Sequence, residues 1–320
     1  MILRTSAATL GLGLAGWPLK STAKTVTKKV LFFSKSAGYE HAVIKRKNGE
    51  PSFVEKILAE QGPERGIEFT FSKDGSLFTP EYLAKFDAYY FYTTGLLTEQ
   101  GTDKNPPMTP AGKAAFLDAI KQGKGFIGTH SATDTFHTNE GPDDGTSNRA
   151  PRYHNYGAKA DPYVRMIGGE FIIHGKQQEA KMRLMDAKFP GFKAGAEDFE
   201  LLEEWYSLKD FSDNLHVILV QETKGMEGEP YQRPAYPATW ARMHGKGRVF
   251  YTSMGHREET WNSERFQNIF FGGIAWATGA AEADVTPNLE KAAPLHAELP
   301  PQTPKKTAKT AEKKTPVKKL

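Results

Sequence analysis

A short apolar strand that runs into a polar turn at His130 constrains the fold more than any other stretch. The strand is Gly125-Phe126-Ile127, the turn is Gly128-Thr129-His130, and small polar residues continue from there to His137. Small residues on both sides of His130 allow the chain to reverse sharply, as at the strand-to-helix elbow of many α/β enzymes. Such elbows carry a serine or cysteine nucleophile at the tip, whereas this chain has no cysteine and places a histidine there. The stretch therefore predicts the layout of an active site without the usual nucleophile.

Strand-like and helix-like segments alternate along the first half of the chain. Short apolar runs between polar residues are typical of buried strands, and apolar residues at helical spacing are typical of helices. Thr79 and Thr109 each precede a proline, a pattern that starts a helix. Strands are predicted at 29–34, 67–71, 87–92 and 125–127, and helices at 51–59, from 80 onward and at 110–122. This alternation predicts a three-layer α/β fold with a doubly wound, mostly parallel sheet, whose ligands bind at the carboxyl ends of the strands.

The second half of the chain begins with a long polar loop and continues mainly with strands. Residues 138–161 are rich in Gly, Pro, Asn and Asp, and such a long loop inside a compact domain is usually functional or disordered. Gly245-Lys246-Gly247 separates two apolar runs and predicts a hairpin, which places His256 just beyond its end. Further strands are predicted at 168–175, 180–185, 199–206, 217–221, 238–243 and 248–253, followed by a closing helix at 266–277.

The two ends of the chain differ from the middle in composition. Residues 1–23 read as a signal peptide, because Arg4 precedes the apolar run Ala7–Gly16 and small residues follow it. That run is too short to span a bilayer, so we expect an exported protein without a transmembrane span. Residues 290–320 are rich in Lys, Pro, Ala and Thr without a hydrophobic period, which is typical of a disordered tail. The folded domain is therefore expected at 24–289.

The basic charge of the chain is concentrated at its ends. The formal net charge is +4, but residues 1–20 and 290–320 together hold ten basic and three acidic residues. The remainder holds 32 basic and 35 acidic residues, a slight acidic excess. Nucleic-acid-binding domains are recognised by a basic surface, so no nucleic-acid partner is expected. A Lys-rich tail is usually solvated, and contact with anionic surfaces is the alternative.

Several motifs occur in a fixed order and together resemble a known family. They are Gly128-x-His130 with Ser131-Ala132-Thr133, Gly168-Gly169-x-Phe171-x-x-His174, Glu204-Trp205-Tyr206, Pro237-x-x-Trp240, Gly245-Lys246-Gly247-Arg248-Val249-Phe250-Tyr251, and Gly255-His256. The set resembles the ThuA-like (trehalose utilisation) family over residues 29–279. The signal-like start, the Lys-rich tail and the long insertion after His137 depart from the family pattern.

The resemblance carries expectations about fold and function. It implies a class I glutamine-amidotransferase-like, flavodoxin-like α/β fold. It also implies a role in sugar catabolism, with a small carbohydrate as ligand and partner sugar oxidoreductases that make 3-keto sugars. Glutamine amide hydrolysis needs a cysteine thiolate, so that activity is excluded. We expect hydrolytic or lytic processing of an oxidised sugar or glycoside.

Three residues are candidate catalytic residues. His130 lies at the tip of the predicted elbow, and His256 follows a strand and a glycine. Glu204 lies on a predicted strand beside Glu203, where one of the two carboxylates faces inward. A histidine that titrates near neutral pH and a buried carboxylate can take a proton beside a keto group and return it to a leaving oxygen. The same residues are candidate ligands of a divalent metal ion, although no local motif such as His-Glu-x-x-His occurs.

Eight further residues are predicted to bind the substrate. Arg257 would stabilise a developing oxyanion, and aromatic rings, Trp261 among them, would stack on sugar faces. Each prediction has a structural alternative, because polar residues near the elbow also cap turns and aromatic residues also pack in cores. The full set is Tyr39, His41, Ser131, Asp134, His137, His174, Trp205 and Arg257.

Other functional classes remain open. A Ser-His-acid triad is disfavoured, because Ser131 adjoins His130 and neighbours at an elbow point in different directions. A carbohydrate-binding protein without catalysis is the main alternative, since a scaffold can lose its nucleophile and keep its ligand site. Saturable binding without product would identify it. An envelope interaction protein that uses its Lys-rich tail is a third class, and deleting the tail would abolish capture of its partner.

Overall fold

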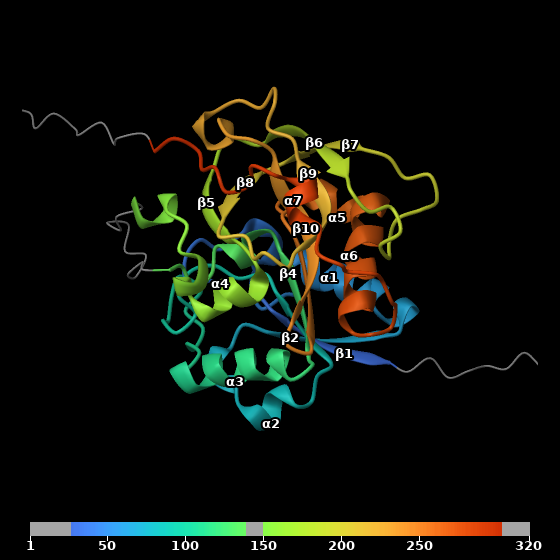
Figure 1. Ribbon diagram of the computed structural model, residues 1–320. Coiled ribbons are helices and arrows are strands. Elements are labelled where there is room, and N and C mark those ends of the chain that lie inside the picture. Colours follow the sequence, from blue (N-terminus) through green and yellow to red (C-terminus); the bar gives the residue numbers. More distant parts are fainter. Residues whose placement is uncertain (1–26, 139–149, 303–320) are drawn as a thin grey trace, which may run out of the picture.

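Most of the segments expected to be strands form a nine-stranded sheet through the centre of the molecule (Figure 1). The computed structural model describes residues 27–138 and 150–302. The strands of this sheet are β1 Lys28–Phe33, β2 Ile67–Ser72, β3 Ala88–Phe91, β4 Gly125–Thr129, β6 Gln178–Leu184, β7 Phe199–Glu203, β9 His216–Gln221, β10 Tyr236–His244 and β11 Gly247–Thr252. Their order across the sheet is β2-β1-β3-β4-β11-β10-β9-β6-β7.

The sheet has a parallel half and an antiparallel half. β2, β1, β3, β4 and β11 pair in parallel, and β10, β9, β6 and β7 extend the sheet with antiparallel pairs. Parallel neighbours need crossover connections, usually helices, which explains the alternation in the first half of the chain. His244 pairs with Gly247, so Gly245 and Lys246 form the turn of the predicted hairpin. The predicted α/β fold with a large, mostly parallel central sheet and flanking helices is confirmed.

Helices begin where the capping signals predict them. The hydroxyls of Thr79 and Thr109 accept hydrogen bonds from backbone N–H groups of the following turn, and each is followed by proline. Ser52 and Glu55 form a capping box, so the first helix begins at Phe53 and not at the predicted Pro51. The helices are α1 Phe53–Gln61, α2 Pro80–Leu83, α3 Pro110–Lys121, α4 Pro162–Ile167, α5 Glu258–Asn262, α6 Glu264–Ala277 and α7 Leu289–Ala292.

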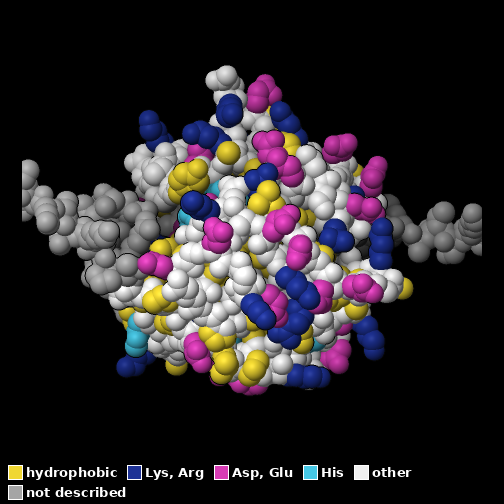
Figure 2. All heavy atoms as spheres, turned by 90° about the horizontal axis from the view of Figure 1, so that it is seen from above, with side chains coloured by type: hydrophobic (Ala, Val, Ile, Leu, Met, Phe, Trp, Pro, Cys, Tyr) yellow, Lys and Arg dark blue, Asp and Glu magenta, His cyan; other side chains and the backbone are white. Residues whose placement is uncertain are grey.

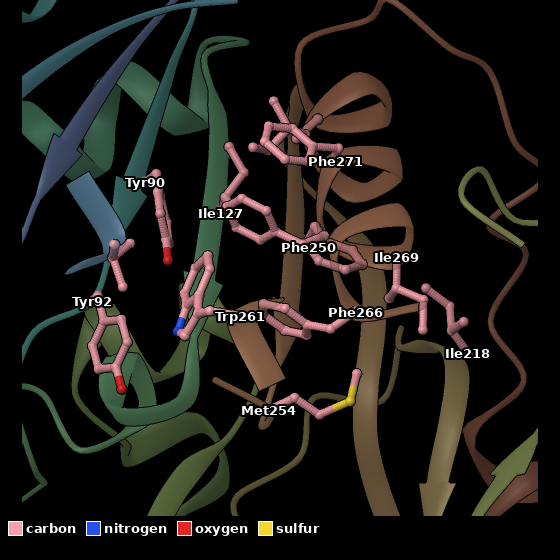
Figure 3. Packing of buried hydrophobic residues seen from close by; sticks show 14 of the residues in the cluster. Tyr90, Tyr92, Ile127, Ile218, Phe250, Met254, Trp261, Phe266, Ile269 and Phe271 are labelled. Carbon is pink, nitrogen blue, oxygen red and sulfur yellow. The ribbon is translucent and has the colours of Figure 1, made fainter. Parts of the chain in front are cut away.

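Helices cover both faces of the sheet and produce three layers. Alternate residues of a strand point to opposite faces, so β1 contributes Val30 and Phe32 to one core and Leu31 and Phe33 to the other. α1, α5 and α6 cover the first face, and Figure 3 shows the apolar side of α6 packed against β4 and β11. α2, α3, α4 and α7 cover the second face. Both helical layers are built by the apolar periodicity of the sequence.

A small second sheet corrects the prediction for residues 199–206. β5 Glu170–His174 and β8 Tyr206–Lys209 pair antiparallel outside the large sheet. The prediction of one continuous strand that contains Glu204 is wrong. β7 ends at Glu203 because it pairs with β6, whereas β8 pairs with β5, and the chain changes sheets in the link between them. Glu204 and Trp205 form this link, so the regular alternation of a strand does not set their directions.

The C-terminal segment corrects a second prediction. α7 buries Leu289 and Ala292, and the Arg233 side chain donates a hydrogen bond to the His296 carbonyl at 2.9 Å. The predicted start of a disordered tail at Glu290 is therefore wrong, because a few apolar residues too sparse to show a period still cover the sheet. The predicted signal peptide at 1–23, part of the loop 138–161 (residues 139–149) and residues 303–320 lie outside the described residues.

Charged side chains of both signs are mixed on the surface. In Figure 2 basic and acidic side chains lie next to one another across the face seen from above. Mixed charge of this kind gives no extended field of one sign on that face. Among the helices that the structure describes, none is long and apolar enough to cross a membrane.

Candidate functional site

Four segments far apart in the sequence meet beyond the carboxyl ends of parallel strands. The loop after β1 carries His41, the turn after β4 carries His130, the β7–β8 link carries Glu204, and the segment after β11 carries His256. Each residue offers one nitrogen or oxygen atom that lies within 4.8 Å of those of the other three. We call these four residues the histidine–glutamate cluster. It lies at the edge of the sheet where α/β folds bind ligands.

The backbone at His130 forms the sharp reversal that the sequence predicts. His130 has a φ of +43°, a left-handed conformation that is uncommon for a residue other than glycine. Gly128 lies at the end of β4, where a Cβ atom would come within 3.0 Å of the Ala132 side chain and 3.1 Å of the Tyr251 ring. The Tyr251 hydroxyl donates to the His130 carbonyl at 2.7 Å, which fixes the turn. A 3-10 helix, His130–Thr133, follows the reversal.

The His130 ring is held in one orientation. Its Nδ1 lies 3.1 Å from the Ser253 carbonyl oxygen, which can only accept, so Nδ1 carries a proton. The ring lies over Tyr206 with 4.2 Å between ring centroids. Nε2, on the other side, faces Glu204 Oε2 at 3.5 Å. His130 therefore presents Nε2 to the cluster.

Glu203 and Glu204 are neighbours with different partners. Glu203 is fully buried and accepts hydrogen bonds from the backbone N–H groups of Gly255 and Glu204, each at 2.9 Å. Glu204 points into the cluster, with Oε2 3.1 Å from His256 Nδ1. Its Oε1 lies 3.4 Å from His174 Nδ1. Glu203 therefore holds the backbone before His256, and Glu204 supplies the carboxylate of the site.

Burial and neighbouring charges set the ionisation of the cluster. Burial alone would raise the pKa of Glu204, but hydrogen bonds with His130 and His256 outweigh it and hold that pKa well below its usual range. Glu204 is therefore a carboxylate at neutral pH. Burial, together with the nearby His130 and His256, lowers the pKa of His41 well below its ordinary value. His41 is therefore a neutral imidazole at neutral pH.

The segment after β11 is fixed through Gly255. Its φ of +122° favours glycine, and its carbonyl accepts hydrogen bonds from the Tyr92 hydroxyl at 2.9 Å and the Trp261 indole at 2.8 Å. The next residue, His256, is 3.3 Å from His130 Nε2 through its Nδ1. Tyr92 just after β3, Trp261 on α5 and Glu203 thus fix the backbone that carries His256.

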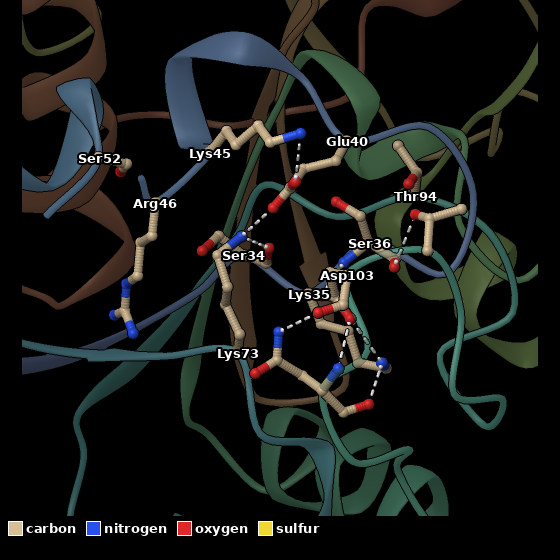
Figure 4. Close-up of polar contacts among 12 residues, drawn as sticks. Ser34, Lys35, Ser36, Glu40, Lys45, Arg46, Ser52, Lys73, Thr94 and Asp103 are labelled. Carbon is tan, nitrogen blue, oxygen red and sulfur yellow. Dashed lines mark hydrogen bonds and ion pairs between the residues drawn. The ribbon is translucent and has the colours of Figure 1, made fainter. Parts of the chain in front are cut away.

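The loop after β1 is pinned by buried polar contacts (Figure 4). Lys73 donates to the Ser34 carbonyl at 2.7 Å and to Glu40 at 3.1 Å, and Thr94 donates to the Tyr39 carbonyl at 2.8 Å. The Ser36 and Lys35 contacts with Asp103 add a second anchor. These bonds flank His41, whose ring meets the His130 ring at 4.8 Å between centroids.

A comparison with protein families places the chain. The family model described as ThuA, trehalose utilisation, matches residues 29–142 and 152–277. The chain belongs to the ThuA family. The family is linked to trehalose utilisation, so the chain is carbohydrate-related. No curated protein matches this chain.

Solved structures show the same fold. A ThuA-like protein from Bacteroides uniformis ATCC 8492 is 18% identical with a TM-score of 0.53, and covers 82% of this chain and 95% of its own. A ThuA-like protein from Parabacteroides merdae ATCC 43184 is 15% identical with a TM-score of 0.52, and covers 81% of this chain and 92% of its own. At these identities the likeness concerns the fold alone.

The family motifs supply His130, Glu204 and His256 of the cluster and His174 of its rim, whereas His41 and Tyr39 lie outside those motifs. The predicted catalytic residues His130, Glu204 and His256 come together with His41, which was predicted to bind substrate. The His174 side chain, 43% exposed, touches Glu204 from the solvent side. Tyr39 is 66% exposed and its ring meets the His41 ring edge-on. His41 and His130 thus form the buried floor, and His174 and Tyr39 form the exposed rim.

Other predicted substrate-binding residues lie apart from the cluster atoms. Trp205 is fully buried and donates from its indole to the Gln178 carbonyl, and Trp261 is buried as well. The prediction that these rings stack on a sugar is therefore wrong, because core packing covers them. Ser131 is buried beside His130, and the Arg257 guanidinium contacts Gln177 and Glu259.

Asp134 and His137 belong to a second buried polar group. His137 Nε2 is 2.6 Å from Asp134, and its Nδ1 is 2.9 Å from Glu170. Lys209 donates to Glu170 at 2.9 Å, and Arg152 lies 3.3 Å from Asp134. This group joins the turn after β4 to β5 through Glu170 and to β8 through Lys209.

Three further groups contribute to the site without having been predicted as site residues. Tyr206 lies under His130, and its hydroxyl is 3.4 Å from His41 Nε2. The only available signal was its place in the motif that begins at Glu204. Glu203 was recognised only as a neighbour of Glu204. The Ser253 carbonyl is a backbone atom, so no residue pattern identifies it.

Proposed function

We propose that this chain cleaves an oxidised sugar or glycoside, one that carries a keto group, by proton transfer at the histidine–glutamate cluster. The observation that supports this proposal best is the Glu204 carboxylate, ionised and set between the imidazoles of His130 and His256. The membership of a carbohydrate-related family supports the class of substrate.

A keto group makes this chemistry accessible to acid–base residues. It acidifies the neighbouring C–H bond, and a base at the cluster takes that proton. The electron pair forms a C=C bond and expels the oxygen of the next carbon, which receives a proton as its C–O bond breaks. Addition of water to the double bond then gives net hydrolysis. The side chains of the cluster transfer these protons, so the reaction depends on His130, Glu204 and His256.

The substrate class points to an upstream reaction. A keto sugar arises by oxidation of a sugar hydroxyl, so a sugar oxidoreductase would supply the substrate. The rim formed by Tyr39 and His174 would meet the sugar ring above the buried floor. The signal-like residues 1–23 support export as part of the proposal.

The test uses 3-keto glucosides and their unoxidised parents as substrates. We expect release of the aglycone from the keto form only, with deuterium from solvent entering the carbon beside the keto group. Glu204→Gln and His256→Asn should lower kcat/KM at least about 100-fold, the scale of general acid–base contributions. Glu282→Gln, at an exposed glutamate far from the cluster, is the matched control. Saturable binding of keto glucosides without product would replace the proposal with the carbohydrate-binding alternative.

A further inference from the structure

Three donor atoms of the cluster form a triangle of the size that a metal ion requires. The distances are 3.5 Å between His130 Nε2 and Glu204 Oε2, 3.1 Å between His256 Nδ1 and Glu204 Oε2, and 3.3 Å between the two nitrogens. Zinc binds imidazole and carboxylate at about 2.0–2.1 Å, so two ligands of a tetrahedral ion lie about 3.3–3.4 Å apart. Octahedral ions with oxygen ligands have a smaller edge, about 3.0 Å, and prefer oxygen to nitrogen. The triangle fits a tetrahedral ion with nitrogen ligands.

The surroundings prepare the donors for a cation. The Nδ1 proton of His130 is held by the Ser253 carbonyl, which leaves the Nε2 lone pair facing the triangle when the ring is neutral. Metal-bound histidines commonly donate their other ring N–H to a backbone carbonyl in this way. Glu203 fixes the backbone N–H of Gly255 and so the residue next to it, His256. Two of the three donors are therefore oriented by buried contacts independent of any ligand.

His41 is the fourth member of the group. It is 2% exposed, and its Nδ1 is buried without a hydrogen-bond partner in the described part of the chain. A buried imidazole nitrogen without a partner is costly, and an ion or an ion-bound water nearby would satisfy it. One ring nitrogen of His41 also lies within 4.8 Å of the three donor atoms, so His41 is placed close enough to serve the position that the triangle leaves open.

We propose that His130 Nε2, His256 Nδ1 and Glu204 Oε2 bind a divalent transition-metal ion, zinc by its geometry, with His41 close to its fourth position. Three protein ligands and one open position are typical of catalytic zinc sites, where the ion lowers the pKa of bound water and polarises a carbonyl. The use of this ion in catalysis rests on the proposed function, but the binding site itself does not.

Metal content and zinc affinity of the full chain test the site directly. We expect about one equivalent of zinc by elemental mass spectrometry after purification, or after reloading the chelated protein with zinc chloride. Titration against a chromogenic chelator should show zinc affinity reduced at least about 100-fold by His130→Asn, Glu204→Gln or His256→Asn. His41→Asn should reduce it by about 10-fold, as for residues around the ligands. His154→Asn, at an exposed histidine, is the matched control and should bind as the parent does.

Two measurements keep the test valid if a variant unfolds. Circular dichroism reports folding of each variant, and asparagine suits position 130 because it adopts left-handed backbone readily. X-ray absorption of the zinc-loaded parent should show nitrogen and oxygen neighbours at about 2.0–2.1 Å in fourfold coordination. Less than a tenth of an equivalent of zinc, manganese or iron after reloading would overturn the metal site.

Metal binding and activity separate the two proposals. Stoichiometric zinc lost in the ligand variants, without turnover of any keto glucoside, supports the metal site and overturns the proposed function. Turnover that persists in metal-free protein overturns the use of the ion in catalysis and leaves the proposed function intact, while the zinc titration alone decides the binding site.

Discussion

At the scale of single residues, two adjacent carboxylates perform different tasks. Glu203 is enclosed and accepts hydrogen bonds from backbone N–H groups, so it holds the chain together at the site. Glu204 faces three imidazoles and is partly open to solvent. The difference follows from the end of β7 between them, because the side chain of Glu203 obeys strand alternation and that of Glu204 does not.

Replacing each carboxylate by an amide should separate the two tasks. Glu203→Gln places an NH2 group against a backbone N–H, and removing an acceptor from a buried donor costs about 1–3 kcal/mol. We expect the free energy of unfolding to fall by that amount. Glu204→Gln should lower it as well, because a carboxylate whose pKa the folded state holds low stabilises that state, but only Glu204→Gln should abolish turnover. Urea unfolding and turnover of keto glucosides measure the two tasks, and a loss of turnover in folded Glu203→Gln equal to that in Glu204→Gln would contradict the division of tasks.

At the scale of elements, the group around His137 ties the turn after β4 to the small sheet. Burial and Arg152 would lower the pKa of His137, but hydrogen bonds to Asp134 and Glu170 outweigh them and raise it. Burial would raise the pKa of Glu170, but the hydrogen bond and charge of His137 and the charge of Lys209 hold it at about 2. The pair is therefore ionised in the folded state.

The ionised pair of His137 and Glu170 should stabilise the fold most within a limited pH range. The Glu170 contribution is complete above its ordinary pKa of 4.5 and is lost as the pH falls from there toward about 2. The His137 contribution is complete below its ordinary pKa of 6.5 and is lost as the pH rises through its raised folded-state pKa. The stabilising contributions of Glu170 and His137 are therefore both complete between pH 4.5 and pH 6.5. We expect the difference in free energy of unfolding between the parent and His137→Gln, measured by urea unfolding, to be largest there, at up to about 3 kcal/mol.

The control for this prediction is His216→Gln, which removes a histidine paired with Asp186 on a distant part of the sheet. The change in free energy of unfolding that His216→Gln causes should be the same with and without His137→Gln, because the stability effects of distant substitutions add. A difference curve for His137→Gln that is flat between pH 4 and 8 would contradict the ionised pair.

The elements differ in how far the sequence determines them. Apolar runs, proline after threonine and the Gly245-Lys246-Gly247 turn predict β1, β4, α3 and the hairpin, because these signals act within a few residues. The break after Glu203 could not be predicted, because it results from long-range strand pairing: β7 pairs with β6 in the large sheet and β8 pairs with β5 in the small one. The burial of Trp205 was missed for the same reason.

At the scale of the whole molecule, the site depends on the complete fold. Its four residues span positions 41 to 256, so no local spacing reveals them as one group. The sequence indicated His130, Glu204 and His256 as candidates because each follows or adjoins a strand. Their distances, and the place of His41 among them, depend on sheet order and on buried partners such as Glu203. Tertiary contacts of this kind leave no periodic trace in a single sequence.

The folded part of the chain continues past residue 289, where the sequence predicts the end of the domain. Asn288 accepts a hydrogen bond from the Val217 N–H at 2.6 Å and donates to the Val217 carbonyl at 3.1 Å, which attaches α7 to β9. Leu289 is 2% exposed, and beyond the expected boundary Ala292 and Ala293 are buried as well. The segment therefore covers one face of the antiparallel half of the sheet.

Two truncations should measure what this segment contributes. A chain that ends at Pro287 leaves the Val217 N–H without Asn288 and exposes the surface under Leu289. Burying one leucine side chain contributes about 1.5–3 kcal/mol, and an orphaned buried N–H costs about 1–3 kcal/mol. We expect its free energy of unfolding to lie at least about 2 kcal/mol below that of a chain ending at Gln302. Urea unfolding compares the two, with Leu289→Ala in the longer chain as an intermediate case. Equal stability of both chains would mean that α7 and the segment after it contribute nothing to the fold.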